Sequence, residues 1–195
     1  VGEVVQVWRP RELNTHETEW GFSCMGYEIS GALGIKMANP NKEVISFVGD
    51  GSYLLNNTDI YSSVITKNKL IIIVCDNGGF AVINRLQLFK GGNEYNNLLK
   101  SSNTPGLVDV DFAKHAESMG AKSEHVNSIS DLEEAFKRAK KSDVTYVISI
   151  KTHAYQWLEG SAFWDSPTLE IPTTDENKEA LKLYKEGKSK QRQGV

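Results

Sequence analysis

The apolar residues of this sequence fall into two kinds of segment. Short unbroken runs, rich in β-branched residues and ended by a polar turn, are typical of buried strands. Between them lie longer segments in which apolar positions recur every three or four residues, as on one face of a helix. We expect strands over residues 44–48, 70–75, 122–126 and 144–150, and helices over residues 26–38, 52–67, 80–88, 111–119, 130–141 and 175–190.

The positions of single residues add detail to these helices. The apolar residues expected to face inward are Ile29, Leu33 and Met37 in the first helix, and Leu55, Ile60 and Val64 in the second. Ser130 followed by Glu133 fits a capping box at the start of a helix. The terminal helix is strongly charged, so we expect it to present a solvated face.

Strands that alternate with helices favour an α/β fold of three layers, a mainly parallel sheet flanked by helices. A length of 195 residues with 39% apolar residues fits one globular domain with appendages. We expect an N-terminal extension or linker remnant over residues 1–20, a central domain over 21–150 and a C-terminal extension over 151–195. Residues 90–105 are rich in Gly, Asn and Ser and too polar for core, which predicts a functional or mobile segment.

Charge and composition argue against several classes of protein. The 22 Lys and Arg residues are outnumbered by 25 Asp and Glu, and most nucleic-acid binders show the opposite balance. No apolar run approaches the roughly 20 residues of a membrane span, and residues 1–11 lack the apolar centre of a signal peptide. Cys24 and Cys75 lie in apolar sequence, so we expect inert buried thiols and a reducing compartment, the cytoplasm.

Two strand ends carry the residues best suited to chemistry. Gly49-Asp50-Gly51-Ser52 follows the first strand, and residues 76–80 (DNGGF) follow the second. In a parallel sheet both ends lie at the carboxyl edge, where ligands bind. The helices that follow present free N–H groups to a phosphate, and Gly49 and Gly51 let the backbone approach it.

A diphosphate at this edge would need a cation, and Mg²⁺ prefers about six oxygen ligands. Asp50, Asn77 and the carbonyl of Gly79 could supply three of them, since the 27 residues from Asp50 to Asn77 span one helix and one strand. A plain turn residue remains the alternative for Asp50, and a non-catalytic module binding magnesium and a nucleotide remains the alternative for the chain. Other phosphate motifs fail, because Leu54 replaces a fingerprint glycine and Ala32 replaces a P-loop lysine.

With two motifs at this separation, the sequence resembles the thiamine-diphosphate enzymes, and specifically their diphosphate-binding domain, over roughly residues 20–150. The resemblance implies thiamine diphosphate and Mg²⁺ as cofactors, with Asp50, Asn77 and the Gly79 carbonyl as metal ligands. The cofactor contacts implied at these strand ends are Gly49, Gly51, Ser52, Asn77, Gly79 and Phe80. Asp76 stands where many family members have an asparagine.

Upstream, residues 23–26 (SCMG) resemble the family segment that holds the aminopyrimidine ring of the cofactor. The resemblance implies that Met25 is an apolar wedge between the two cofactor rings, beside Cys24, and that the Ser23 carbonyl accepts from the 4′-amino group. Holding that amine close to the thiazolium ring would let it take the proton of the reacting carbon. A plain core position is the alternative for Met25.

Four segments, over residues 8–12, 23–29, 76–84 and 152–157, resemble more closely the members that hydrolyse a C–C bond of a cyclic 1,2-diketone in myo-inositol catabolism. That resemblance implies hydrolytic ring opening of a small-molecule substrate. His153 is the candidate catalytic residue, with a loop histidine at a packing edge as the alternative. An acetolactate-synthase-like or 2-oxo-acid-decarboxylating enzyme is the alternative within the family.

The resemblance also implies partners. Family members activate the cofactor with a glutamate on a separate pyrimidine-binding domain of a neighbouring subunit, and we find no such domain ahead of Val1. We therefore expect the C-terminal third of an enzyme, inactive by itself, whose full-length form is a homo-oligomer (a dimer or tetramer). His16 stays open between a loop residue and a proton-transfer group, and His115 and His125 are assigned no role.

Overall fold

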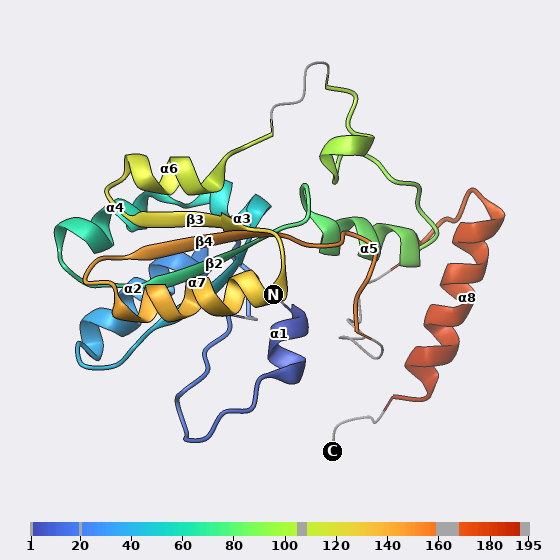
Figure 1. Ribbon diagram of the computed structural model, residues 1–195. Coiled ribbons are helices and arrows are strands. Elements are labelled where there is room, and N and C mark those ends of the chain that lie inside the picture. The colour runs from blue at the N-terminus through green and yellow to red at the C-terminus, as the bar shows by residue number, and fades with distance from the viewer. Residues whose placement is uncertain (1, 20, 105–108, 159–167, 192–195) are drawn as a thin grey trace.

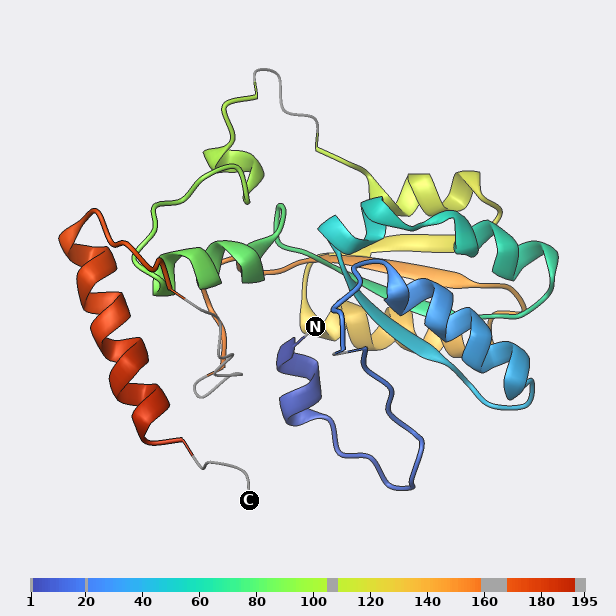
Figure 2. The same cartoon turned by 180° about the vertical axis from the view of Figure 1, so that it is seen from behind.

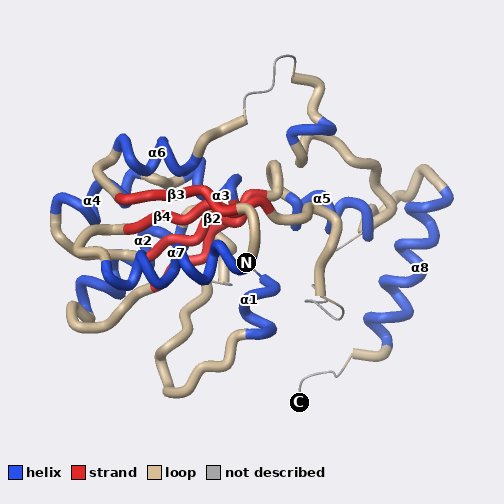
Figure 3. The backbone as a smooth tube through the Cα atoms, viewed as in Figure 1, coloured by secondary structure: helices blue, strands red, loops and turns tan. Residues whose placement is uncertain are grey.

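The structure is a computed structural model that describes residues 2–19, 21–104, 109–158 and 168–191. Its sheet has four strands, all parallel, in the order β1-β2-β4-β3 (Figure 3). The strands are β1 (Ile45–Gly49), β2 (Ile71–Asp76), β3 (Lys122–Val126) and β4 (Tyr146–Lys151). The four predicted strands are confirmed within one or two residues, and β1, β2 and β4 end at the same edge.

Helices cover both faces of this sheet (Figure 1). The helices of the first layer are α2 (Tyr27–Ala38), α3 (Asp50–Leu55), α4 (Thr58–Ile65) and α6 (Phe112–Ser118). The opposite face is covered by α7 (Ile129–Lys141). Successive residues of β2 point to opposite faces, so that Ile72 and Val74 pack under the first layer while Ile71 and Ile73 pack under α7. The predicted three-layer α/β fold is confirmed.

The single helix expected over residues 52–67 is wrong, because the chain breaks it at Asn56 and Asn57, between α3 and α4. Asn57 turns its side chain back to donate to the carbonyl of Tyr53 at 3.1 Å, and Asn56 donates to the hydroxyl of Ser30 at 2.6 Å. Such side-chain bonds to nearby groups compete with helical hydrogen bonds. The break sets the two short helices at separate places over the sheet.

Some predicted details of the helices are also wrong. The capping residue of α7 is Ser128, whose hydroxyl accepts from the N–H of Asp131 at 3.1 Å, so the Ser130–Glu133 capping box does not form. Met37 and Leu55 are 60% and 57% exposed, because each lies at the last turn of its helix, beyond the sheet. The other four residues expected to face inward, namely Ile29, Leu33, Ile60 and Val64, pack in the core.

Four further elements lie outside the two layers: α1 (Gly2–Val7), α5 (Ala81–Phe89), the 3₁₀ helix η1 (Leu99–Ser101) and α8 (Asp175–Ser189). Helix α5 continues from the carboxyl edge of the sheet, and α8 stands beyond it, well apart from the sheet (Figure 2). The amide of Asn177 in α8 donates to the carbonyl of Gly91 at 2.7 Å, just past the end of α5. The helices predicted at 80–88 and 175–190 are confirmed, whereas α1 was not predicted.

The polar segment predicted over residues 90–105 is partly anchored, and Pro105 lies outside the described residues. Leu98 is 2% exposed and forms an antiparallel bridge with Gly79, so the expectation that the segment carries no core residue is wrong. Among the described residues, no helix combines the length and apolar character needed to cross a bilayer.

Candidate functional site

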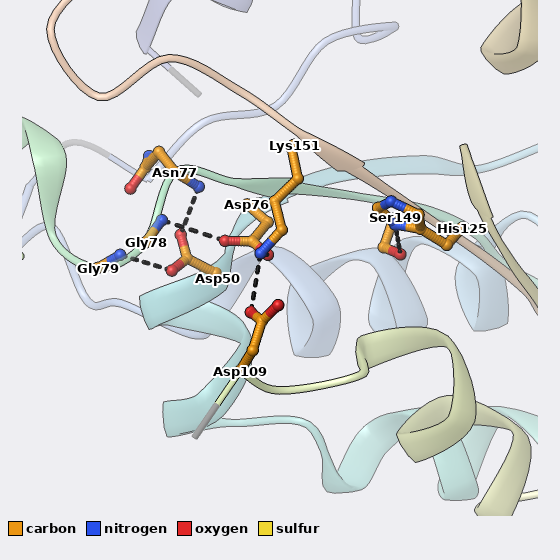
Figure 4. Close-up of polar contacts among 9 residues, drawn as sticks. All are labelled: Asp50, Asp76, Asn77, Gly78, Gly79, Asp109, His125, Ser149 and Lys151. Atoms are coloured by element: carbon orange, nitrogen blue, oxygen red, sulfur yellow. Dashed lines mark hydrogen bonds and ion pairs between the residues drawn. The ribbon is translucent and has the colours of Figure 1, made fainter. Parts of the chain in front are cut away.

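Asp50 is the first residue of α3, directly after β1, and only 4% of it is exposed. Both of its carboxylate oxygens accept hydrogen bonds from the backbone that follows β2 (Figure 4). Oδ1 accepts from the N–H of Asn77 at 3.2 Å, and Oδ2 accepts from the N–H of Gly79 at 2.6 Å. The structure therefore brings together the two strand ends that the sequence singled out.

The side-chain amide of Asn77 completes this arrangement. One of its two terminal atoms lies 3.2 Å from Asp50 Oδ1 and 2.9 Å from the carbonyl oxygen of Gly79. With the amide nitrogen in that place, Asn77 donates to both oxygens; with the amide oxygen there, three acceptors face one another, which only a cation makes favourable. Ligand oxygens at about 2.1 Å from Mg²⁺ lie about 3.0 Å apart on one face of an octahedron. The two distances from the Asn77 amide, to Asp50 Oδ1 and to the Gly79 carbonyl oxygen, agree with that spacing.

The turn after β2 depends on backbone that only glycine adopts easily. Gly78 and Gly79 have φ angles of +79° and +140°. A Cβ at Gly79 would overlap the carbonyl oxygen of Asn97, since residues 97–99 run alongside the turn. The N–H of Phe80 donates to that carbonyl at 2.7 Å, and the N–H of residue 99 donates to the Gly78 carbonyl at 2.9 Å. The sequence singled out residues 90–105 as a functional or mobile segment, but the contact of residues 97–99 with this turn was not predicted.

Burial and hydrogen bonding shift the pKa of Asp50 in opposite directions. Loss of solvent raises its pKa, and the nearby charge of Asp76 acts in the same direction. The N–H groups of Asn77 and Gly79 oppose the rise in pKa without cancelling it. A cation at the three converging oxygens would favour the charged carboxylate.

Asp76 ends β2 and is itself buried, with 7% of its side chain exposed. Its Oδ1 accepts from the N–H of Gly78 at 3.1 Å, and its Oδ2 pairs with the ammonium of Lys151 at 2.7 Å. Lys151 also contacts Asp109 at 2.9 Å, and both carboxylates raise the pKa of the lysine. Lys151 was not identified from the sequence; its only signal is its position at the end of a buried strand.

The other predicted cofactor contacts at the strand ends pack closely. Gly51 has no room for a side chain, because a Cβ there would overlap the ring of Phe80. Gly49 has a φ angle of −75°, and nothing lies within 4 Å of the place its Cβ would take. Ser52 follows in the first turn of α3; Gly49 and Ser52 are partly exposed on either side of the buried Asp50 and Gly51.

Residues 23–25 form an exposed loop before α2, and Gly26, which follows them, is buried. Cys24 is exposed, so the expected buried thiol is wrong there, and Met25 is 46% exposed, which argues against the core alternative. Glu19 shapes the loop by accepting from two of its N–H groups, which lower the pKa of that carboxyl. Gly26 packs directly against Asn56, which follows the end of α3. A Cβ at Gly26 would lie 2.5 Å from the Cβ of Asn56, so the loop is held next to this end of α3.

His153 lines an open cavity of about 480 Å³ together with Asn77, Gly78 and Tyr155. Its Nδ1 accepts from the N–H of Tyr155 at 3.1 Å. The structure thus brings this candidate to the side of the turn after β2. Cys75, by contrast, is partly buried, and burial raises the pKa of its thiol, as an inert cysteine requires.

The remaining histidines lie elsewhere. His115 pairs with the hydroxyl of buried Tyr53 at 2.9 Å, under the first helix layer. His125 pairs with Ser149 at 3.0 Å, between β3 and β4 (Figure 4). His16 is exposed in the segment before α2 and lies 3.4 Å from the hydroxyl of Thr18.

Comparison with known proteins gives three findings. Residues 1–150 match the family described as "Thiamine pyrophosphate enzyme, C-terminal TPP binding domain". The 3D-(3,5/4)-trihydroxycyclohexane-1,2-dione hydrolase of Shouchella clausii is 37% identical to this chain, and the match covers 92% of this chain and 28% of the hydrolase. The hydrolase of the same name from Clostridium tetani is 38% identical, and the match covers 84% of this chain and 26% of that hydrolase. A solved 4-hydroxybenzoylformate decarboxylase of Rhodococcus jostii RHA1, thiamine diphosphate-dependent, covers 66% of this chain and 23% of its own, with a TM-score of 0.55 and 28% identity. The chain therefore spans about a quarter of the length of these proteins.

Proposed function

Because this chain belongs to the thiamine pyrophosphate enzyme family, we propose that it is the diphosphate-binding part of an enzyme that hydrolyses a C–C bond of a cyclic 1,2-diketone. The names of its relatives, which are trihydroxycyclohexanedione hydrolases, support this choice of substrate. The chain spans about 28% of such a relative, so the remaining parts of the active site belong to the rest of the enzyme.

One observation carries the cofactor assignment, namely that the Asn77 amide lies 3.2 Å from Asp50 Oδ1 and 2.9 Å from the Gly79 carbonyl oxygen, about the spacing of neighbouring Mg²⁺ ligands. These three groups would hold Mg²⁺, and the backbone of Gly51 and Ser52 would contact the diphosphate. When bound, thiamine diphosphate supplies a nucleophilic carbon that adds to a carbonyl of the substrate. The chain's own residues fix the charged end of the cofactor in place.

On the substrate side, His153 is the proposed proton-transfer residue. Its Nδ1 already accepts from the N–H of Tyr155, so the neutral ring carries its proton on Nε2. That Nε2–H can donate a hydrogen bond to a substrate oxygen in the cavity that His153 shares with Asn77 and Gly78, and the ring can transfer a proton to that oxygen when both of its nitrogens are protonated.

The rest of the cofactor would be held by two further parts. The exposed loop with Ser23, Cys24 and Met25 is the proposed site of the aminopyrimidine ring. A separate pyrimidine-binding domain would supply the activating glutamate, within a homo-oligomer. We place this enzyme in the cytoplasm, which agrees with the free thiols of Cys24 and Cys75.

Calorimetry of this chain with thiamine diphosphate and with ATP, each with and without Mg²⁺, tests the cofactor assignment. We expect heat only with thiamine diphosphate and Mg²⁺ together, at lower affinity than in the full-length enzyme because the pyrimidine-binding domain is lacking. Binding of ATP instead would support the nucleotide-binding module. Binding of thiamine diphosphate that is equally strong without Mg²⁺ would contradict the metal site.

Decarboxylation of a 2-oxo acid is the second candidate, favoured by the structural similarity to the 4-hydroxybenzoylformate decarboxylase. The full-length enzyme distinguishes the two reactions. Hydrolase activity predicts ring opening of the cyclic dione with no release of CO₂. Release of CO₂ from pyruvate or another 2-oxo acid would support the second candidate and contradict the first.

A further inference from the structure

Asp76 is a buried carboxylate next to the proposed metal ligands. A carboxylate with 7% of its side chain exposed is costly unless each oxygen has a partner. Oδ1 accepts from the N–H of Gly78 at 3.1 Å, and Oδ2 contacts the ammonium of Lys151 at 2.7 Å. Asp76 therefore links the turn after β2 to a cation on another strand.

Lys151 is placed for this contact by the register of the sheet. It is paired with Asp76 across β2 and β4, and the N–H of Thr152 extends the ladder by donating to the Asp76 carbonyl at 2.7 Å. Directly opposed side chains of a sheet lie on the same face and within contact distance. The ammonium lies between two carboxylates, the buried one of Asp76 and the exposed one of Asp109 (Figure 4).

The charge of Lys151 bears directly on the shape of the turn. Asp50 and Asp76 repel each other, and both hold the same turn, Asp50 through the N–H groups of Asn77 and Gly79 and Asp76 through that of Gly78. Without the lysine, the buried carboxylate of Asp76 would lose its cation and turn toward solvent or toward a metal at Asp50. Either movement would release the N–H of Gly78.

We propose that Lys151 is a positioning residue of this site, which by pairing with Asp76 holds the turn that presents the Asn77 amide and the Gly79 carbonyl. Its relevance to the reaction rests on the proposed function, since those two groups are the proposed metal ligands. Lys151 pairs with Asp76 and Asp109, and it acts on the turn through Asp76.

Amide hydrogen exchange of this chain, measured without cofactor, tests the proposal. In Lys151→Met we expect the turn amides of residues 77–79 to lose protection by about tenfold, a change that corresponds to about 1.4 kcal/mol. Amides within β2 and β4 should change much less. In Asp76→Asn/Lys151→Met the protection should return, because an asparagine oxygen still accepts from Gly78 and no buried charge is left unpaired.

A matched control is available at the opposite edge of the sheet. Lys122 also lies at a strand end and pairs with Asp143 at 2.9 Å, but both side chains are exposed, so Lys122→Met should leave the turn amides unchanged. If Lys151→Met does not fold, Asp76→Asn and the double variant Asp76→Asn/Lys151→Met are compared instead. The turn amides should then be equally protected in both, because residue 151 has no buried carboxylate left to pair with.

Three results would overturn the proposal. The first is that the turn amides of Lys151→Met stay fully protected. The second is that protection is lost evenly over the whole sheet. The third is that the turn amides of the double variant are as poorly protected as those of Lys151→Met, or less protected than those of Asp76→Asn. Because the exchange is measured without cofactor, failure of this proposal and failure of the calorimetric test remain distinguishable.

Discussion

Replacing Gly79 with alanine tests how tightly the turn after β2 is built. At a φ of +140° a Cβ would overlap the carbonyl oxygen of Asn97 and lie 3.1 Å from the Cα of Leu98. Backbone strain of this kind costs about 1–3 kcal/mol. Relief requires residues 97–99 to move away and give up hydrogen bonds of 2.7 and 2.9 Å to the turn, at about 1 kcal/mol each. We expect a loss of about 3 kcal/mol in the free energy of unfolding, with loss of the magnesium-dependent binding of thiamine diphosphate.

Gly78→Ala is the matched control for this change. Gly78 also has a positive φ, +79°, but nothing lies within 4 Å of the place its Cβ would take. Only the left-handed conformation then carries a penalty, about 1 kcal/mol. Urea denaturation of both variants, with calorimetry of cofactor binding, measures the difference. Equal stability and equal binding in the two variants would refute the argument that residues 97–99 hold Gly79 in place.

Three other expectations can be checked on the same chain. Asp50→Ala should abolish the magnesium-dependent heat of thiamine diphosphate binding while the circular dichroism is kept; unchanged heat would contradict the metal site. Mass spectrometry should find Cys24 labelled by a thiol reagent well before Cys75, whose pKa is raised by burial, and equal rates would contradict this. The hydrogen bond from Arg138 lowers the pKa of Glu124 below its ordinary 4.5. The ion pair therefore stabilises the fold fully above pH 4.5, and this contribution is lost as the pH falls through the lowered pKa. Glu124→Gln should therefore cost up to about 1 kcal/mol at neutral pH and nothing once the pH has fallen through the lowered pKa of Glu124, and a constant difference in urea titrations would contradict the pairing.

The fold could be predicted because its information is local and repeated. Successive residues of β2 face the helix layers on alternate sides of the sheet. The run from Ile71 to Val74 is therefore apolar throughout, which is typical of a buried strand. Asp50 and Asn77 could be paired because each directly follows such a strand, and parallel neighbours end at one edge. These predictions needed only strand order and spacing.

What could not be predicted depends on tertiary contacts between distant segments. Lys151 contacts Asp76 because β4 lies beside β2, an order that the sequence leaves open. Leu98 is buried in a polar segment because its backbone pairs with Gly79, which no apolar pattern reveals. The start of α7 shows a local version of the same limit, since Ser128 and Ser130 are both capping residues by type and only the backbone decides between them.

Asp50 accepts hydrogen bonds from the turn after β2 and is also a proposed metal ligand. These two roles join the end of β1 to the end of β2. Its carboxylate accepts from the N–H groups of Asn77 and Gly79, and the side-chain amide of Asn77 lies between that carboxylate and the carbonyl oxygen of Gly79. The hydrogen bonds bring three acceptors into one small volume, where their mutual repulsion is relieved either by rotating the Asn77 amide or by a cation. A metal bound there would therefore select an amide orientation without moving the backbone. The backbone of the site is already in place in the protein, held by the carboxylate of Asp50 and by the hydrogen bonds of residues 97–99 to the turn.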